Sequence, residues 1–183
     1  MNDMELRALY LLNQLGWNTV PEKTGDAVIF RRNGGDELQA ILQIRQLPNE
    51  RTMTLSISSG LSAYSDIIAR IAGREPSHMW LHQRNILKRQ MEFGDADIEE
   101  ASNEALAWWL EQDNLATIKA LTAPPPDTGQ PQLKHLAALA YLGDFNTLID
   151  YQEIFRKGKR LNFVPMIKSE MLDRAVDIAV ERA

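Results

Sequence analysis

The first fifteen residues place their apolar side chains three or four positions apart, which is the spacing of one face of an α-helix. These side chains belong to Met4, Ala8, Leu11, Leu12 and Leu15. Asn2 or Asp3 is suited to accept hydrogen bonds from the free amides at the helix start, and Gly16 is suited to the turn after its end. The pattern therefore predicts an amphipathic N-terminal helix.

Three runs that follow have the character of β-strands, and they span residues 27–32, 38–45 and 52–58. In the third run, Met53, Leu55 and Ile57 alternate with Thr and Ser, which is typical of a strand with one face in water. Residues 33–35 and 48–49 are rich in the Gly, Asn and Pro of tight turns. We therefore predict a three-stranded antiparallel meander with one exposed face.

After Gly60 the apolar spacing favours helices. The expected helices are residues 63–71, 77–93, 97 to about 121 with a possible break at 113–114, 133–142, 145–156 and 166–183. The second of them would present Trp80, Leu87 and Met91 as one stripe. Gly143 and Asp144 form a short joint that should make the fifth helix of this series an antiparallel partner of the fourth.

Prolines interrupt the helical half of the chain. Residues 124–126 are three prolines, and Asp127, Gly129 and Pro131 follow, so that no helix can continue through this segment. We therefore divide the chain into an α+β lobe at residues 1–123, a proline-rich linker at 124–132 and a helical hairpin plus C-terminal helix at 133–183, packed on the same domain. The predicted fold class is α+β, with a mostly helical C-terminal half.

Composition narrows the classes of function. The chain has 183 residues, of which 44% are apolar, and this is enough for one well-packed domain. A net charge of −5 disfavours nucleic-acid binding, which needs a basic surface. Because there is no cysteine, disulfides, thiolate metal sites and cysteine nucleophiles are excluded. No apolar run approaches the roughly 20 residues of a membrane span, and no signal peptide is evident, so we expect a cytoplasmic protein.

One segment carries charge of a single sign, because residues 95–113 hold seven carboxylates and no Lys or Arg. Neighbouring positions on a helix point about 100° apart, so Trp108 should enter the core while Trp109 lies near its edge. Tryptophan is enriched among residues that dominate binding energy, although both indoles could be purely structural. The sequence thus predicts a surface for a basic partner, made of Asp95, Asp97, Glu99, Glu100, Glu104, Trp109, Glu111 and Asp113.

Other candidate sites are less complete. His78 and His82 stand four apart on an expected helix, a spacing that can hold zinc, but the glutamate of a His-Glu-x-x-His motif is absent and no third ligand is evident. We therefore expect no metal and no cofactor. An enzyme without a short motif, using one of these histidines or His135 with a distant carboxylate, stays open.

Two basic clusters complete the set of candidates. One comprises Arg84, Lys88 and Arg89 on an expected helix, and the other surrounds Gly158 in residues 156–160. The second could bind phosphate, but cations near a helix end more commonly complement its last carbonyls. Phosphate-loop, dinucleotide and nucleophile-elbow signatures are missing, so the sequence favours a binding function over catalysis.

A small, acidic, cysteine-free α+β chain with a wet sheet face and a carboxylate-rich helix resembles bacterial immunity proteins. These bind a secreted or contact-delivered toxin and block or distort its active site. The resemblance implies a non-catalytic module that neutralises a cytoplasm-acting toxin by meeting its basic face with residues 95–113. It leaves the oligomeric state open.

The helix-strand-strand-strand-helix order of residues 1–72 is also similar to the head of type III secretion chaperones. These are small acidic proteins that dimerise and wrap a segment of an effector. Such chaperones usually continue with two more strands and a final helix, whereas this chain is expected to turn to helices from about Ser77. A secretion chaperone is therefore the alternative function, and an enzyme is the second alternative.

Overall fold

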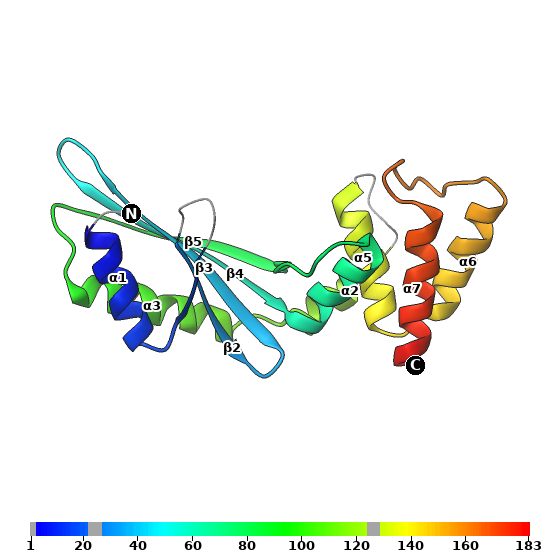
Figure 1. Ribbon diagram of the computed structural model, residues 1–183, viewed down its shortest axis with the longest axis horizontal. Coiled ribbons are helices and arrows are strands. Elements are labelled where there is room, and N and C mark those ends of the chain that lie inside the picture. Colours follow the sequence, from blue (N-terminus) through cyan, green and yellow to red (C-terminus); the bar gives the residue numbers. More distant parts are fainter. Residues whose placement is uncertain (1–2, 22–26, 124–128) are drawn as a thin grey trace. The chain divides into compact units, whose positions relative to one another are not determined.

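The computed structural model describes residues 3–21, 27–123 and 129–183, and the chain divides into two compact units (Figure 1). Unit 1 comprises Met1–Gly60 and Trp80–Gln112, and unit 2 comprises Leu61–Met79 and Asp113–Ala183. This division differs from the boundary at 124–132 expected from the sequence, of which residues 124–128 lie outside the described part of the chain. The chain thus leaves unit 1 and returns to it once.

Unit 1 contains a sheet in which strands that follow one another in sequence are neighbours. The strands are β1 (Asn18–Pro21), β2 (Ala27–Asn33), β3 (Asp36–Gln46), β4 (Arg51–Leu61) and β5 (His82–Gln90). β1 pairs with β2, β2 with β3 and β4 with β5, and these three pairs are antiparallel. The α+β class is confirmed, and the sheet has five strands where the sequence predicted three.

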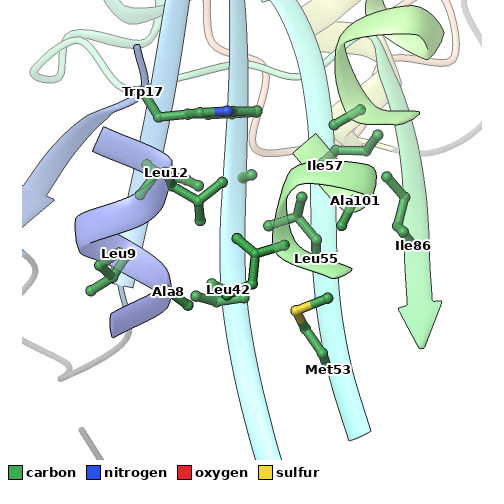
Figure 2. Packing of buried hydrophobic residues seen from close by; sticks show 14 of the residues in the cluster. Ala8, Leu9, Leu12, Trp17, Leu42, Met53, Leu55, Ile57, Ile86 and Ala101 are labelled. Carbon is green, nitrogen blue, oxygen red and sulfur yellow. The ribbon is translucent and has the colours of Figure 1, made fainter. Parts of the chain in front are cut away.

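Two helices of unit 1, α1 (Asp3–Gln14) and α3 (Asp95–Leu110), lie against each other on one face of this sheet (Figure 1). The inward residues of the strands, such as Leu42 and Leu55, pack against Leu12 of α1 and Ala101 of α3 (Figure 2). α1 ends before Gly16, whose φ of +87° suits the turn into β1. The core of unit 1 thus forms between the apolar faces of the two helices, which have a period of 3.6 residues, and the apolar face of the sheet, whose strands have a period of 2.

The opposite face of the sheet is polar, as the alternation in β4 predicts. Gln39 of β3, Ser56 and Ser58 of β4, and Gln83 and Asn85 of β5 line a shallow hollow of about 480 Å³ there. In β4 the side chains of Met53, Leu55 and Ile57 are buried against the helices instead. One sheet face therefore holds the core of unit 1 and the other carries hydroxyl and amide groups.

The helix expected at residues 77–93 is wrong, because this segment contains β5. Its register places Ile86 opposite Leu55 with 4% exposure, while Leu87 is 51% exposed on the other face. The apolar spacing of residues 82–90 fits a helix as well as a strand, because the segment is short. Hydrogen bonding to the edge of β4 favours the strand. The stripe of Trp80, Leu87 and Met91 does not exist, since all three side chains are exposed.

Unit 2 is helical, with α2 (Ser62–Ala72), α4 (Asn114–Ala120), α5 (Gly129–Tyr141), α6 (Phe145–Arg156) and α7 (Ser169–Arg182). The predicted break at 113–114 is confirmed, because α3 ends at Leu110 and α4 begins at Asn114. The joint between α5 and α6 is also confirmed. There Gly143 has φ of +73°, and the carboxylate of Asp144 accepts a hydrogen bond from the Thr147 amide at 3.2 Å.

The C-terminal part of unit 2 packs around α5 and α7. Both α2 and α6 contact these two helices, and Leu136, Leu148 and Leu172 are completely buried among them. α7 begins at Ser169, three residues later than expected, since residues 157–168 form a loop. Pro131 lies in the first turn of α5, where its missing amide donor is tolerated.

Candidate functional site

The candidate site is the outer side of α3 in unit 1. The helix turns Ile98, Ala101, Ala105 and Trp108 toward the sheet, and these side chains are buried. Solvent-exposed positions of the helix recur at spacings of three and four, and Glu111 follows directly after the helix. We call this stripe the α3 face: Ala96, Glu99, Asn103, Ala107, Leu110 and Glu111. Leu110 is 77% exposed, the largest exposed fraction among the large apolar side chains of the described residues.

Three of the predicted carboxylates pair with cations of unit 1. Asp95 meets Arg7 of α1 at 2.9 Å. On the other flank of α3, Glu100 and Glu104 each bind a cation of β5, and these pairs are Lys88–Glu100 at 2.5 Å and Arg84–Glu104 at 2.6 Å. Exposed pairs of this kind contribute little to stability, but they neutralise half of the six carboxylates between Asp95 and Glu111.

The pairing also corrects the first basic cluster. Arg84, Lys88 and Arg89 lie on a strand and not on a helix, so that alternate side chains point to opposite faces. Arg84 and Lys88 point toward α3, whereas Arg89 stands opposite Thr52, whose side chain lies on the polar face. The three cations therefore form no common anion site.

Asp97 serves the start of α3. The sequence predicted a helix from residue 97, but the helix starts two residues earlier, at Asp95, with Gly94 before it. The carboxylate of Asp97 accepts a hydrogen bond from the amide of Gly94 at 2.8 Å. This bond, with a further one from the Gln90 side chain, lowers the pKa of Asp97. Its negative charge also complements the positive end of the helix dipole.

Two of the remaining carboxylates, Glu99 and Glu111, are exposed, and no ion pair to either is found in the described part of the chain. Asp113 belongs to unit 2, where its side chain accepts a hydrogen bond from the amide of Ala116 at 2.8 Å and caps α4. The structure therefore brings seven of the eight predicted residues together on unit 1. It gives Asp113 a capping role in the other unit.

The two tryptophans lie as their spacing predicts. Trp108 is 9% exposed within the core of unit 1, and Trp109 is partly buried against the same core. Gln112 donates a hydrogen bond to the carbonyl of Trp108 at 2.7 Å and so helps to close the end of the helix. Trp109 is followed directly in the sequence by Leu110 and Glu111, which form the C-terminal end of the α3 face.

A groove lies at the other end of α3, and the sequence did not predict it. It has a volume of about 470 Å³ and lies among the N-terminal ends of α1 and α3 and the adjacent ends of β3 and β4. Its apolar wall comprises Met4, Ile44, Phe93 and Ile98, and its charged residues are Asp3, Arg7, Arg51 and Asp95. Phe93 precedes α3 outside any periodic pattern, so no signal in the sequence marked this site.

Arg51 is the distinctive charge of this groove. Its Nε donates to the side-chain oxygen of Gln46 at 2.5 Å, and its Nη1 lies 3.9 Å from the sulfur of Met4. The other cation, Arg7, is held by Asp95, which raises the pKa of Arg7. No carboxylate pairs with Arg51 among the described residues, so this guanidinium keeps donors for an outside group.

The histidines do not form a metal centre. His78 lies in unit 2 and His82 opens β5 in unit 1, so the helix that was expected to align them does not exist. Within the described ranges, no three His, Asp or Glu side chains are grouped so that they could hold a metal ion.

His135 is instead a buried histidine of unit 2 whose two ring nitrogens both have partners. Its Nδ1 lies 2.8 Å from the carbonyl oxygen of Leu121, and its Nε2 lies 3.2 Å from the hydroxyl of Tyr151. These contacts fit a neutral ring that donates from Nδ1 and accepts at Nε2. Burial lowers the pKa of His135, which favours this neutral form.

The second basic cluster is used largely within unit 2. Arg160 donates three hydrogen bonds to loop carbonyls, those of Phe163, Val164 and Ile167. Arg156 lies 3.8 Å from Asp173, and Lys157 lies 3.7 Å from Glu153. The cluster therefore bonds to the loop after α6 and to nearby carboxylates, and not to the last carbonyls of the helix as expected from the sequence.

Comparison with known proteins adds a family but no activity. The model of a family of unknown function, DUF6990, matches residues 7–180. No curated protein and no solved structure matches the chain. In the part of the chain that the structure describes, no helix is long and apolar enough to span a bilayer.

Proposed function

The chain belongs to the DUF6990 family, and we propose that it is a non-catalytic protein-binding module that acts as an immunity protein. In this proposal it binds a cognate bacterial toxin in the cytoplasm through the α3 face and so neutralises it. The observation that carries the proposal is the α3 face itself. This face combines carboxylates that have no ion pair among the described residues with an exposed leucine on a helix that has no Lys or Arg of its own.

Charge favours a basic partner. After the three ion pairs with Arg7, Arg84 and Lys88, the helix keeps the negative charges of Asp97, Glu99 and Glu111. A surface with excess charge of one sign speeds encounter with an opposite surface and discriminates against partners of the same sign. The exposed ion pairs could also exchange partners at small cost, since surface pairs are weak.

Apolar surface supplies the second requirement of an interface. Leu110 is exposed beside the partly buried Trp109. Interfaces concentrate their binding energy in a few large side chains surrounded by polar ones, and Trp is among the most frequent of these. The C-terminal turn of α3 is therefore the expected centre of contact, and Glu99 and Glu111 are the expected charged rim.

The test begins with capture of the partner from native cells with the tagged full chain, followed by mass spectrometry. The captured protein is then expressed alone and with the chain in a sensitive host. An immunity protein should restore growth, and the charge reversals Glu99→Lys and Glu111→Lys together should abolish this protection. Binding by the wild type should also weaken steeply as salt is added, because the attraction is electrostatic.

A matched control carries Glu75→Lys and Glu170→Lys, which change net charge equally at exposed positions of unit 2. This control should protect the host as well as the wild type does. Equal protection by both double variants would refute the α3 face as the binding surface. A captured protein that is harmless when expressed alone would refute the immunity function.

The secretion chaperone stays a second candidate because of β5. The sequence suggested that the chain turns to helices after Ser77, but strand β5 and helix α3 follow α2. This adds one of the two later strands and the final helix of a chaperone, although four strands rather than three precede α2, and α2 belongs to unit 2. The partly apolar groove beside α1 also suits an effector segment. A stable dimer and a captured protein with an unfolded segment would favour the chaperone, whereas a monomer would favour immunity.

A further inference from the structure

We propose that the groove between the N-terminal ends of α1 and α3 binds an extended segment of a partner protein. The segment would carry a large apolar side chain next to a carboxylate. This inference rests on the proposed protein-binding function, but it uses residues outside the α3 face. Its ligand is acidic, whereas the partner surface opposite the α3 face is basic, so the two contacts can be tested separately.

The walls of the groove fit one large apolar side chain. Ile44, Phe93 and Ile98 are less than a tenth exposed, and together with Met4 they line a cavity of about 470 Å³. Binding pockets of roughly 300–1,000 Å³ with apolar walls and a few polar groups are typical of ligand sites. The flexible thioether of Met4 can adapt to the shape of the entering side chain.

The charge of Arg51 is the reason to expect a carboxylate in the ligand. Arg7 and Asp95 neutralise each other at 2.9 Å, and Asp3 lies in the first turn of α1, where it complements the helix dipole. Arg51 remains with donors to spare after its contacts with Gln46 and Met4. A guanidinium in this situation is matched best by a carboxylate, which accepts two parallel hydrogen bonds from it.

Geometry selects a peptide over a small ligand. The groove is open along the helix ends and is bordered by exposed side chains, whereas small ligands are usually enclosed. An extended segment can place one side chain in the cavity and keep its flanks in water.

The test is a titration of the ¹⁵N-labelled full chain, followed by NMR. The probe is a blocked hexapeptide with Leu-Asp at its centre and Gly and Ser at its ends, and the matched peptide has Leu-Lys instead. The Leu-Asp peptide should shift the amide signals of Phe93, Ile98 and Arg51 and should bind at least tenfold more tightly than the Leu-Lys peptide. Arg51→Gln should weaken binding about tenfold, the factor that about 1.4 kcal/mol gives.

The control variant is Arg89→Gln, which removes the same charge from the polar face of the sheet and should leave peptide binding unchanged. Equal affinity of Arg51→Gln and wild type, or shifts outside the groove, would overturn the proposal. Octanoate serves as a third probe, and binding as tight as that of the peptide would assign the groove to small amphiphilic acids instead. The Glu99→Lys and Glu111→Lys variant should still bind the peptide, so failure of the α3 face and failure of the groove are distinguishable.

Discussion

The hydrogen bond between Trp17 and Ser102 should be a main tie between α3 and the rest of unit 1. The indole Nε1 donates to the Ser102 hydroxyl at 2.8 Å, and both side chains are 1% exposed. Figure 2 shows Trp17 at one end of the apolar cluster, above Leu12. We therefore predict that Ser102→Ala destabilises unit 1, because it leaves the indole N–H buried without an acceptor.

The magnitude follows from two opposing effects. An unsatisfied buried donor costs roughly 1–3 kcal/mol. Alanine is a better helix former than serine by about 0.5 kcal/mol, and this part of the change stabilises α3. The expected net loss in the free energy of unfolding is therefore roughly 0.5–2.5 kcal/mol. The neighbouring exposed residue provides a control, since Asn103→Ala should gain the helix propensity without losing a buried bond.

The assay is urea unfolding followed by tryptophan fluorescence. All four tryptophans, Trp17, Trp80, Trp108 and Trp109, lie in unit 1, so this signal does not report on unit 2. The midpoint should fall for Ser102→Ala at an unchanged slope, and it should hold or rise for Asn103→Ala. If Ser102→Ala were as stable as Asn103→Ala, the buried bond would contribute nothing and the reasoning would fail.

Two further predictions concern unit 2. Because burial lowers the pKa of His135 in the folded chain, the unfolded chain binds the proton more strongly, and the stability of unit 2 should fall as pH drops through about 6.5. Far-UV circular dichroism melts should show this loss, and His135→Gln should reduce the pH dependence; an equal pH dependence in the variant would contradict the assignment. Asp144→Ala should lower the free energy of unfolding by about 1 kcal/mol in the same melts, because the Thr147 amide loses its hydrogen-bond acceptor at the start of α6. Asp150→Ala, at an exposed position within α6, is the control and should change the stability little.

The sequence predicts where the carboxylates of the proposed acidic surface lie along the chain, but not which of them form ion pairs. The absence of Lys and Arg between residues 95 and 113 is a property of the sequence, but the partners of these carboxylates are not local. Arg7 stands 88 residues before Asp95, and Lys88 reaches Glu100 only because β5 is a strand. Three of the seven carboxylates in this segment, which seems uniformly acidic along the chain, are therefore paired with cations in the fold.

The groove around Arg51 was not predictable from the sequence for a related reason. Its residues come from α1, β3, β4, the loop before α3 and α3 itself, and none of these segments carries a motif. What makes Arg51 distinctive is that no carboxylate among the described residues pairs with it, although Asp3 and Asp95 line the same groove. That absence depends on which side chains the fold gathers there, and not on the neighbours of Arg51 in the sequence.

The sequence by itself determined the α+β class, the N-terminal helix, the half-exposed meander and the joints at Gly16 and at Gly143 with Asp144. These features depend on local periodicity and on residues whose backbone preferences act within a few positions. The tertiary structure decided that residues 82–90 form β5, that Asp113 caps a helix of another unit, and which carboxylates are paired. Strand pairing and charge pairing join groups that are distant in sequence, so their energies are set only when the chain has folded.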